Sequence, residues 1–280
     1  MRLAYLGPEG TFSDEALRAA AGPDDERRPY PTIPDALEAV RAGEADRALV
    51  PIENALEGAV NPTLDTLVAQ APDIAIVGET VLPIRTCLIA ARELRPEEIR
   101  VVVSHAQPLG QCAHFLRREL PGAEVRAATS TAEAVRSVVA SSEPWAALGP
   151  CGAARLYGGV VLREGVDDDD DNATRFVWVG RAGSPPVDAG TTGGWKTSLA
   201  FAGAGDASPG WLVRCLSEFA FRGVNLTKIE SRPRRARLGH YVFLVDAEGR
   251  VDEAAVADAV AGLHAHCEEV RVLGTYPARA

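Results

Sequence analysis

The stretch Asn172-Ala173-Thr174-Arg175-Phe176 is the one around which this chain is organised. It follows five consecutive aspartates, Asp167 to Asp171, and leads into the apolar segment Val177-Trp178-Val179. The amide of Asn172, the hydroxyl of Thr174 and the guanidinium of Arg175 therefore lie between an exposed acidic loop and the start of a short buried strand. Polar groups at the end of a buried strand are well placed to face a cleft. The alternative is a solvated turn with Arg175 in a surface ion pair, and the rest of the chain has to decide between the two.

The composition is that of an ordinary globular protein. The chain has 280 residues, enough for one large or two modest domains, and is 46% hydrophobic and 24% charged. A net charge of -10 leaves no basic surplus to meet phosphates, so we expect no nucleic acid as a partner. No apolar run approaches membrane-spanning length and the N-terminus lacks a signal-peptide pattern. We therefore expect a cytoplasmic protein with no membrane partner.

The cysteines and histidines do not form a pattern typical of metal binding. The five cysteines are scattered and contain no C-x-x-C, which predicts reduced thiols in the cytoplasm. Among the five histidines, His264 and His266 are two residues apart and would point to different faces of a helix. We therefore expect no metal site.

Strand-like and helix-like segments alternate through the first part of the chain. The expected strands are 3–6, 45–50, 74–77, 81–90, 99–103, 125–128 and 145–148. The expected helices are 10–21, 34–42, 64–69, a helix that begins at Pro108, 134–140 and 151–157. This alternation predicts α/β layers with a largely parallel sheet, in which ligands bind beyond the carboxyl ends of the strands.

Polar clusters stand at four of the expected strand ends. They are Gly10 to Ser13, Glu53-Asn54, Ser104 to Gln107 and the stretch 172–176. A single polar strand end is ordinary, but four in one domain favour a ligand site. The turn at Gly10 to Ser13 leaves backbone N–H groups that can hold an anion, although Thr11 and Ser13 are also ordinary helix-capping residues.

A second pattern begins after residues 182–194, which are rich in Gly and Pro and indicate a linker. Strands are expected at 197–202, 224–230, 240–246 and 270–274, and helices at 209–222 and 252–265. The order βαββαβ is the ferredoxin-like split motif. Gly203-Ala204-Gly205 hints at a dinucleotide loop, but Ser208 stands where a third glycine is required. The predicted domains are therefore 1–181 and 195–280.

Four motifs of the first domain resemble those of prephenate dehydratases, and they occur in the same order. They are Gly7-Pro8-Glu9-Gly10-Thr11-Phe12-Ser13, Val50-Pro51-Ile52-Glu53-Asn54, Ser104-His105-Ala106-Gln107-Pro108 and Asn172-Ala173-Thr174-Arg175-Phe176. In the second domain, Pro209-Gly210-Trp211-Leu212-Val213 and Asn225-Leu226-Thr227-Lys228-Ile229-Glu230-Ser231-Arg232-Pro233 resemble an ACT regulatory domain. Together these motifs span nearly the whole chain.

The resemblance implies a fold and an activity. The fold would be α/β, with a two-lobed, periplasmic-binding-protein-like catalytic domain followed by a ferredoxin-like ACT domain. The reaction would convert prephenate to phenylpyruvate in phenylalanine biosynthesis, with loss of carbon dioxide and the ring hydroxyl. Because that reaction gains aromaticity, we expect no cofactor. Feedback by L-phenylalanine at the ACT domain and a homodimer or homotetramer are also implied.

The resemblance and the chemistry assign candidate residues. The predicted catalytic residues are Thr174, Glu53, Asn54, Ser104 and Gln111. The predicted substrate-binding residues are Thr11, Ser13, His105, Gln107, Glu133, Asn172, Arg175 and Phe176. The predicted allosteric residues are Gly210, Trp211, Leu212, Val213, Asn225, Leu226, Glu230, Ser231, Arg232 and Pro233.

Each role follows from what the substrate requires: anion donors, a proton donor and enforced geometry. Thr174 would hydrogen-bond the leaving hydroxyl, and Arg175 could hold a carboxylate as a bidentate fork. Glu53 or Glu133, if buried, could be a protonated acid, although Glu133 also fits a capping box with Ser130.

Some alternatives remain open. An arogenate dehydratase would act on a substrate with an amino group in place of the keto group. A non-catalytic two-lobed ligand-binding protein with an amino-acid-sensing module would bind without turnover. The pair Ser104-His105 suggests a hydrolase, but adjacent residues rarely form a nucleophile–base pair and no G-x-S-x-G is present. Within the ACT motif, Trp211 replaces the usual Ala and could redirect or abolish effector binding.

Overall fold

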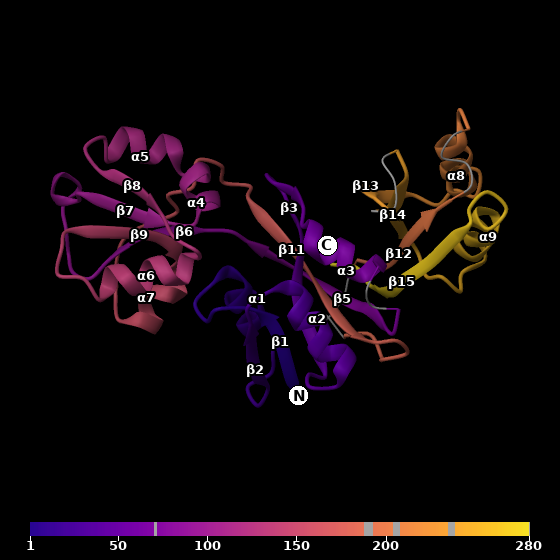
Figure 1. Ribbon diagram of the computed structural model, residues 1–280, viewed down its shortest axis with the longest axis horizontal. Helices are drawn as coiled ribbons and strands as arrows, with labels where there is room; N and C mark the ends of the chain where they lie inside the picture. Colours follow the sequence, from indigo (N-terminus) through magenta and orange to yellow (C-terminus); the bar gives the residue numbers. More distant parts are fainter. Residues whose placement is uncertain (70–71, 188–192, 204–207, 235–238, 280) are drawn as a thin grey trace. The chain divides into compact units, whose positions relative to one another are not determined.

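The computed structural model, drawn in Figure 1, describes residues 1–69, 72–187, 193–203, 208–234 and 239–279. The chain divides into two compact units. The first unit contains residues 1–36, 49–58 and 81–176, and the second contains 37–48, 59–80 and 177–280. Three strands pass from one unit into the other: β3 (Arg47–Asn54), β5 (Ile74–Pro83) and β11 (Ala173–Arg181). Neither unit is therefore one continuous stretch of chain.

The N-terminal sheet has the strand order β2-β1-β3-β11-β5, with the short β4 (Gly58–Ala59) paired to β3. Strands β1 (Arg2–Leu6) and β2 (Glu26–Tyr30) are parallel and are joined by α1 (Phe12–Ala20). The Ala55 N–H donates to the Ala173 carbonyl at 2.9 Å, so β3 ends beside the start of β11. Neighbouring strands β3 and β11 therefore run in opposite directions, and the sheet is mixed rather than largely parallel as predicted. Helices α2 (Ile33–Ala42) and α3 (Asn61–Ala69) complete this region.

The second sheet lies wholly in the first unit and is also mixed. Its order is β10-β6-β9-β7-β8, with β7 parallel to β8 and β9, and β6 antiparallel to β9 and β10. The strands are β6 (Thr86–Ala90), β7 (Val101–Ser104), β8 (Glu124–Ala127), β9 (Trp145–Pro150) and β10 (Val160–Glu164). Helices cover both faces in Figure 1: α4 (Ala106–Gln111) and α5 (Ala113–Glu119) on one, α6 (Thr131–Val139) and α7 (Cys151–Tyr157) on the other. A short turn of 3-10 helix, Pro96–Glu98, precedes β7.

Side chains of this sheet alternate between two apolar cores because successive strand residues point to opposite faces. Leu88 and Val102 pack in the cluster that contains Phe115 of α5. Ile89 and Val103 pack in the cluster formed with α6 and α7. Because helices cover both faces of the sheet, its buried strands are continuous apolar runs in the sequence. Those runs are the pattern that predicted the strands.

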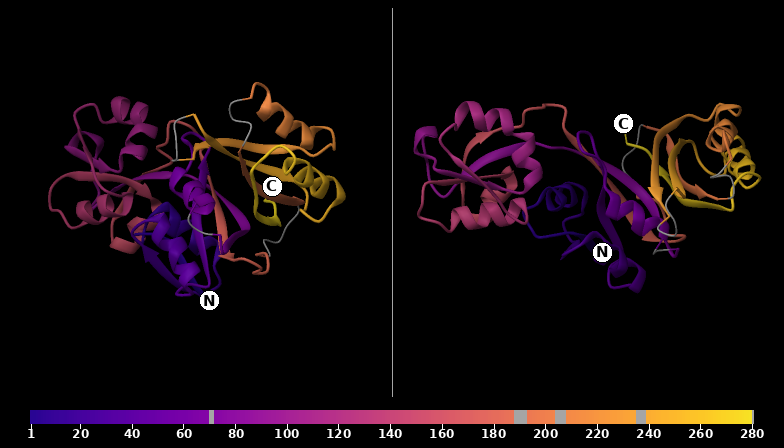
Figure 2. Two further views of the ribbon diagram at one scale, coloured as in Figure 1. Left: turned by 45° about the vertical axis from the view of Figure 1, so that its right-hand side comes forward. Right: turned by 45° about the horizontal axis from the view of Figure 1, so that its top comes forward.

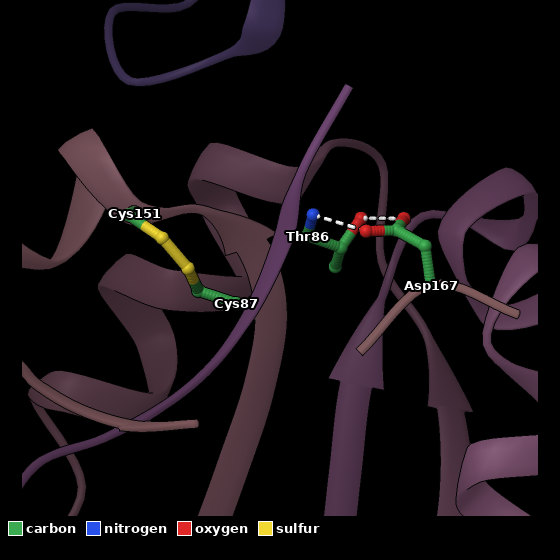
Figure 3. Close-up of a disulfide and its surroundings, with 4 residues drawn as sticks. All are labelled: Thr86, Cys87, Cys151 and Asp167. Atoms are coloured by element: carbon green, nitrogen blue, oxygen red, sulfur yellow. Dashed lines mark hydrogen bonds between the residues drawn. A yellow bond between two sulfur atoms is a disulfide. The ribbon is translucent and has the colours of Figure 1, made fainter. Parts of the chain in front are cut away.

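The expectation of reduced thiols is wrong for two of the five cysteines. A disulfide joins Cys87 of β6 to Cys151 at the start of α7, with Cα atoms 5.3 Å apart (Figure 3). The two residues are 64 positions apart in sequence, and only the packing of α7 beside β6 brings them together. Cys112, Cys215 and Cys267 are free thiols.

The C-terminal part of the second unit has the predicted βαββαβ order. Its elements are β12 (Trp195–Ala202), α8 (Trp211–Ala220), β13 (Leu226–Pro233), β14 (Tyr241–Glu248), α9 (Ala254–Leu263) and β15 (Glu269–Pro277). The sheet is antiparallel in the order β13-β14-β12-β15. Both helices lie on one of its faces in Figure 2. Trp211 and Phe219 of α8 and Leu263 of α9 pack in one apolar core with Phe201.

Ion pairs and backbone bonds tie this sheet to α3 and β5 within the second unit. Arg232 binds both carboxylate oxygens of Asp65, at 3.0 and 3.1 Å. Lys196 Nζ lies 2.9 and 3.0 Å from the two oxygens of Glu79. The first residues of the predicted linker also lie beside β5, because the Val187 N–H donates to the Val77 carbonyl at 2.7 Å. Residues 188–192 of that linker, and Ala204 and Gly205 of the dismissed glycine loop, lie outside the described residues.

Several element boundaries differ from those predicted. Strand β3 continues to Asn54 and β11 begins at Ala173, so the polar residues predicted for strand ends lie within strands. Strand β13 runs on through Pro233, and α8 begins at Trp211 because Gly210 adopts a left-handed conformation with φ 77°. Strands β2, β4 and β10 were not predicted. Among the described residues, no helix has the length and apolar character needed to cross a membrane.

Candidate active site

The side chain of Asn54 lies at the centre of a hydrogen-bond network in the first unit. Its Nδ2 is 2.9 Å from Asn172 Oδ1, 3.0 Å from Thr174 Oγ1 and 3.2 Å from the Ala173 carbonyl. Its Oδ1 accepts the backbone N–H groups of Leu56 and Glu57, both at 3.0 Å. Asn54 is only 6% exposed. The amide therefore holds the end of β3 and the start of β11 in one fixed arrangement.

The local sequence explains why an asparagine stands at this position. An Asn side chain accepts N–H bonds from residues two and three positions further on, and this closes a turn after the strand. The remaining N–H groups of the same amide can then reach across to β11. An aspartate could close the turn but could not donate to Thr174 or Asn172.

Asn172 extends the network towards α4. It is 2% exposed, and its Nδ2 donates to Gln111 Oε1 at 3.2 Å. Gln111 Nε2 in turn approaches Glu57 Oε1 at 3.4 Å. The structure thus brings together four of the predicted site residues, which are separated by up to 120 positions in sequence. Glu57 was not predicted, and its position one turn after Asn54 was the available signal.

Thr174 and Arg175 do not act on the same side of β11. Successive strand side chains point to opposite faces. Thr174 faces Asn54, whereas Arg175 binds Glu53 through Nε at 3.2 Å and Nη2 at 3.0 Å. Phe176, which was predicted to bind substrate, is 1% exposed and packs in the interior. The predicted pairing of one hydroxyl donor with one adjacent guanidinium therefore separates into two contacts, one on each face.

The Thr174 hydroxyl is oriented by its partner. Its oxygen accepts a hydrogen bond from Asn54 Nδ2, so its own proton is directed elsewhere. The side chain is half-buried, and a group placed beside it can receive that proton in a hydrogen bond. The amides of Asn54, Asn172 and Gln111 carry no charge, and the Glu57 carboxylate reaches the network through Gln111.

Three residues of the Ser104 motif are not part of this network. Ser104 is fully buried, and its hydroxyl donates to the Leu148 carbonyl at 2.7 Å, which fixes β7 against β9. His105 is exposed and caps α4 by accepting the Gln107 N–H at Nδ1, at 3.4 Å. Gln107 is exposed as well. Ser104 and His105 therefore do not form a nucleophile–base pair, in agreement with the rejection of a hydrolase motif.

Thr11 and Ser13 stand at the start of α1, as the sequence predicted. Thr11 is the N-cap residue, and its hydroxyl donates to the Pro8 carbonyl at 3.0 Å and accepts the Asp14 N–H at 3.4 Å. Ser13 is buried. Asp14 Oδ2 already takes the Gly10 N–H at 3.0 Å, so a carboxylate of the chain itself occupies part of the predicted anion site.

Glu133 is a helix cap. Ser130 Oγ accepts the Glu133 N–H at 3.0 Å, as in the predicted capping box, but the carboxylate binds the N–H and hydroxyl of Thr129 rather than the Ser130 N–H. The Thr129 hydroxyl bond lowers the pKa of Glu133 below its usual value, against the opposing effect of burial. The protonated acid proposed for this position is therefore not favoured.

The predicted effector residues fall into two groups. Gly210, Trp211, Leu212 and Val213 line a cavity of about 270 Å³, together with Ser208, Gly239, Tyr241 and Phe243, which the sequence analysis missed. Asn225, Leu226 and residues 230–233 do not line it. Trp211 is turned inward, because its Nε1 donates to the His266 carbonyl at 2.7 Å and its ring meets Phe201 edge-on.

The described residues contain no cluster of three or more His, Cys, Asp or Glu side chains suited to holding a metal ion. The candidate centre is instead a network of side-chain amides around one hydroxyl, with the Glu57 carboxylate at its edge.

Fold and site together define a mixed α/β protein whose candidate centre is built from hydrogen bonds. The chain belongs to the prephenate dehydratase family, whose sequence profile matches residues 3–184. A prephenate dehydratase of Mycobacterium leprae (strain Br4923) is 42% identical over 286 residues, covering 99% of this chain and 87% of that protein.

Solved structures are similar to this chain over almost all of its length. The prephenate dehydratase of Arthrobacter aurescens in complex with L-Phe has a TM-score of 0.89 and 38% identity, covering 99% of this chain and 90% of that one. A protein described as GqqA, a novel type of quorum quenching acylase, has a TM-score of 0.86 and 29% identity, with coverages of 99% and 98%. The second likeness shows that this fold also carries a different reported activity.

Proposed function

We propose that this chain converts prephenate to phenylpyruvate, as a cytoplasmic enzyme of phenylalanine biosynthesis, with Thr174 at the chemical centre. The observation that carries the proposal is the hydrogen bond from Asn54 Nδ2 to Thr174 Oγ1 at 3.0 Å, within a chain of this family. It leaves the hydroxyl proton of Thr174 directed away from the network. That proton is the one offered to the departing ring hydroxyl.

The hydroxyl acts as a polarising donor. A threonine is too weak an acid to transfer its proton unaided, but a hydrogen bond that strengthens as the C–O bond breaks stabilises the transition state. Donation from Asn54 withdraws electron density from Oγ1 and makes that proton a better donor. Departure of carbon dioxide supplies the electrons that complete the aromatic ring, so the chain has only to align the two leaving groups.

The remaining network residues hold this geometry. Asn172 and Gln111 connect Asn54 to α4, and Glu57 closes the network. Arg175, bound to Glu53 on the opposite face of β11, supports the strand rather than the hydroxyl in this conformation. The turn at Gly10 to Ser13 remains the proposed site for a substrate carboxylate, which would compete there with the Asp14 carboxylate.

Turnover of prephenate by the purified protein tests the proposal. Phenylpyruvate is expected to form with the parent chain and to fall steeply with Thr174→Ala. Comparing kcat/KM for prephenate and arogenate separates the two dehydratase activities, because only the keto or amino substituent differs. Saturable binding of prephenate with no product would instead indicate a non-catalytic ligand-binding protein and would refute the proposal.

The proposal extends to domains and regulation. Residues 1–181 would form the two-lobed, periplasmic-binding-protein-like catalytic domain, 182–194 the linker and 195–280 an ACT domain that binds L-phenylalanine. The support is the cavity beside Gly210 to Val213, with Tyr241 and Phe243 in its wall, which suits an aromatic amino acid. The inward orientation of Trp211 favours an intact cavity over a blocked one.

Val213 of α8 and Phe221, the residue that follows this helix, provide a matched test of the effector site. Val213 is 66% exposed and lines the cavity, whereas Phe221 is 86% exposed, follows the same helix and does not line it. L-Phenylalanine is expected to inhibit turnover and to raise the melting temperature, because it binds the folded chain. Val213→Asp should abolish both effects and Phe221→Asp should preserve them. Equal responses in the two variants would refute this location.

A homodimer or homotetramer is part of the same proposal. Strand β13 is an edge strand, and Ile229 on it is half exposed, which leaves backbone groups and an apolar side chain for a second copy. Ile229→Lys is expected to shift sedimentation towards the monomer. An unchanged sedimentation coefficient would argue against this edge as the contact.

A further inference from the structure

We propose that Asp168, the second residue of the five-aspartate run, is a positioning residue of the active site and acts through Gln111. The inference rests on the proposed function, because its effect on turnover is expressed through the Thr174 network. Only its location in an acidic run distinguished Asp168 in the sequence, and such a run is usually a solvated loop.

The helical segment that carries Gln111 is broken immediately after it. Helix α4 ends at Gln111, α5 begins at Ala113, and Cys112 between them has φ -113° and ψ 17°. Such a break leaves the last carbonyl groups of one helix and the first N–H groups of the next without helical partners. The orientation of the Gln111 side chain depends on how that break is held.

Asp168 holds the break by three hydrogen bonds. Its backbone N–H donates to the Gln111 carbonyl at 2.8 Å. Its Oδ2 accepts the His114 N–H at 2.8 Å and its Oδ1 accepts the Phe115 N–H at 2.9 Å. One residue, distant in sequence, thus caps the start of α5 and fixes the end of α4.

The loop that presents Asp168 is itself anchored. Asp167 accepts the backbone N–H and the hydroxyl of Thr86, both at 2.6 Å (Figure 3). The Val166 N–H donates to the Thr86 carbonyl at 3.0 Å, and Thr86 is fully buried. Asp167 therefore fixes the loop to β6, which gives Asp168 a rigid base.

Cys112 reports how close these carboxylates are to the break. The pKa of its thiol is raised to about 12. Burial is the main cause, and the charges of Asp167 and Asp168 also contribute to the rise. The carboxylates of Asp167 and Asp168 therefore lie close to Cys112, the residue that follows Gln111.

The position of Gln111 matters because its side-chain amide joins two parts of the network. Oε1 accepts from Asn172 Nδ2 at 3.2 Å, and Nε2 reaches Glu57 Oε1 at 3.4 Å. Both contacts are already near the limit of hydrogen bonding, so a small shift of the α4 terminus breaks them. A displacement of about 1 Å at such a distance from the chemistry can reduce a rate by roughly a hundredfold.

The same aspartate run supplies its own control. Asp170 is highly exposed, with 93% of its side chain accessible, and it pairs only loosely with Arg85 at 3.2 Å. An exposed pair of this kind contributes little. Asp168→Asn and Asp170→Asn make the same chemical change two residues apart.

We expect Asp168→Asn to reduce kcat/KM for prephenate about tenfold and Asp168→Ala to reduce it further, because the amide keeps one of the two acceptors. Asp170→Asn should stay within about twofold of the parent. When Gln111→Ala is already present, adding Asp168→Asn should lower kcat/KM by less than a further factor of about two. The reason is that Asp168 acts through the Gln111 side chain, which is then missing. A full additional loss in that background, or equal losses for Asp168→Asn and Asp170→Asn, would overturn the proposal.

A second readout does not depend on turnover. The side-chain amide resonances of Gln111 should move in Asp168→Asn and stay in place in Asp170→Asn. If the parent chain fails to convert prephenate, the proposed function fails while this measurement still decides the role of Asp168. Unmoved Gln111 resonances in a folded Asp168→Asn protein would refute that role.

Discussion

Two groups of buried polar side chains in the first unit differ in how completely they are hydrogen-bonded. Around Asn54, the amide nitrogen and oxygen both have partners, and Asn172 continues the network. On α1, Asp14 Oδ1 and Glu15 Oε2 are buried without a hydrogen-bond partner among the described residues. Amides both donate and accept, so they can satisfy one another without charge, whereas neighbouring carboxylates only accept and compete for donors. The first group forms a rigid scaffold, and the second carries an unrecovered cost of burial.

The largest effect on stability is expected from removing Asn54, the centre of the fully hydrogen-bonded network. Asn54→Ala leaves the N–H groups of Leu56 and Glu57 and the Asn172 oxygen without their partner. At about 1 kcal/mol for each lost bond to the exposed residues Leu56 and Glu57, and about 2 kcal/mol for the buried Asn172 oxygen, the free energy of unfolding should fall by about 4 kcal/mol. Urea denaturation measures the change. Asn54→Asp keeps the acceptor and should lose roughly half as much. If Asn54→Ala is as stable as the parent, the network around Asn54 does not contribute to stability as described.

Thr174→Ala should separate catalysis from stability. Loss of a preorganised donor at the reacting group is expected to lower kcat by about 10²–10³. The free energy of unfolding should change by less than about 1 kcal/mol, because Thr174 is half-buried and the rest of the network remains. Thr174→Ser keeps the hydroxyl and should recover most of the rate. Parental turnover in Thr174→Ala would remove this residue from the centre of the site.

A buried but fully paired carboxylate sharpens the comparison. Glu79 is 1% exposed and meets Lys196 through both oxygens, and Oε1 also accepts the Arg279 N–H at 2.9 Å. Glu79→Gln leaves the Lys196 ammonium uncompensated, so the free energy of unfolding should fall by about 3 kcal/mol. Thermal and urea denaturation at neutral pH test this. A more stable Glu79→Gln protein would show that pairing does not offset burial here.

Glu15→Gln is expected to have the smallest effect and the opposite sign. Burial, more than the repulsion from Asp14, raises the pKa of Glu15, against attraction by Arg155. The native state therefore favours the protonated form of Glu15. The stability that this residue contributes is fully present below its unfolded pKa and is lost as the pH rises through its folded pKa. Removing the charge should raise the melting temperature by about 2–4 °C at about pH 7.

The same variant should show no advantage at about pH 3, where Glu15 is protonated in both states because the pH lies well below its unfolded pKa of about 4.3. Differential scanning calorimetry at the two pH values makes the measurement. An equal gain at both pH values would mean that the raised pKa is not its cause.

The local features were predictable because short-range patterns determine them. The strand before Gly7, the helix capped by Thr11 and the S-x-x-E start at Ser130 all appear where the sequence placed them. Strand β2 was missed because Glu26-Arg27-Arg28-Pro29-Tyr30 carries no apolar alternation and is specified by its pairing with β1. The order of the strands in the mixed sheets was likewise beyond any local pattern.

For the site, the sequence indicated most of the participants but not their contacts. Asn54, Gln111, Asn172 and Thr174 were all predicted, and all enter one network. Ser104 was predicted as catalytic as well, yet its hydroxyl serves a strand carbonyl. Nothing in the spacing of these residues distinguishes a side chain that points into the sheet from one that points to a ligand.

The sequence by itself determined the family, the α/β character and the polar residues available for chemistry, because residue types and their order are properties of the chain. Only the tertiary structure decided that Thr174 faces Asn54 while Arg175 faces Glu53, since the pleat of β11 and its register with β3 separate adjacent residues. It also turned part of an acidic run into a structural clamp, because Asp168 meets the start of α5 more than 50 residues away in the chain. Contacts over such separations depend on how the strands and helices pack, which the order of residues does not display.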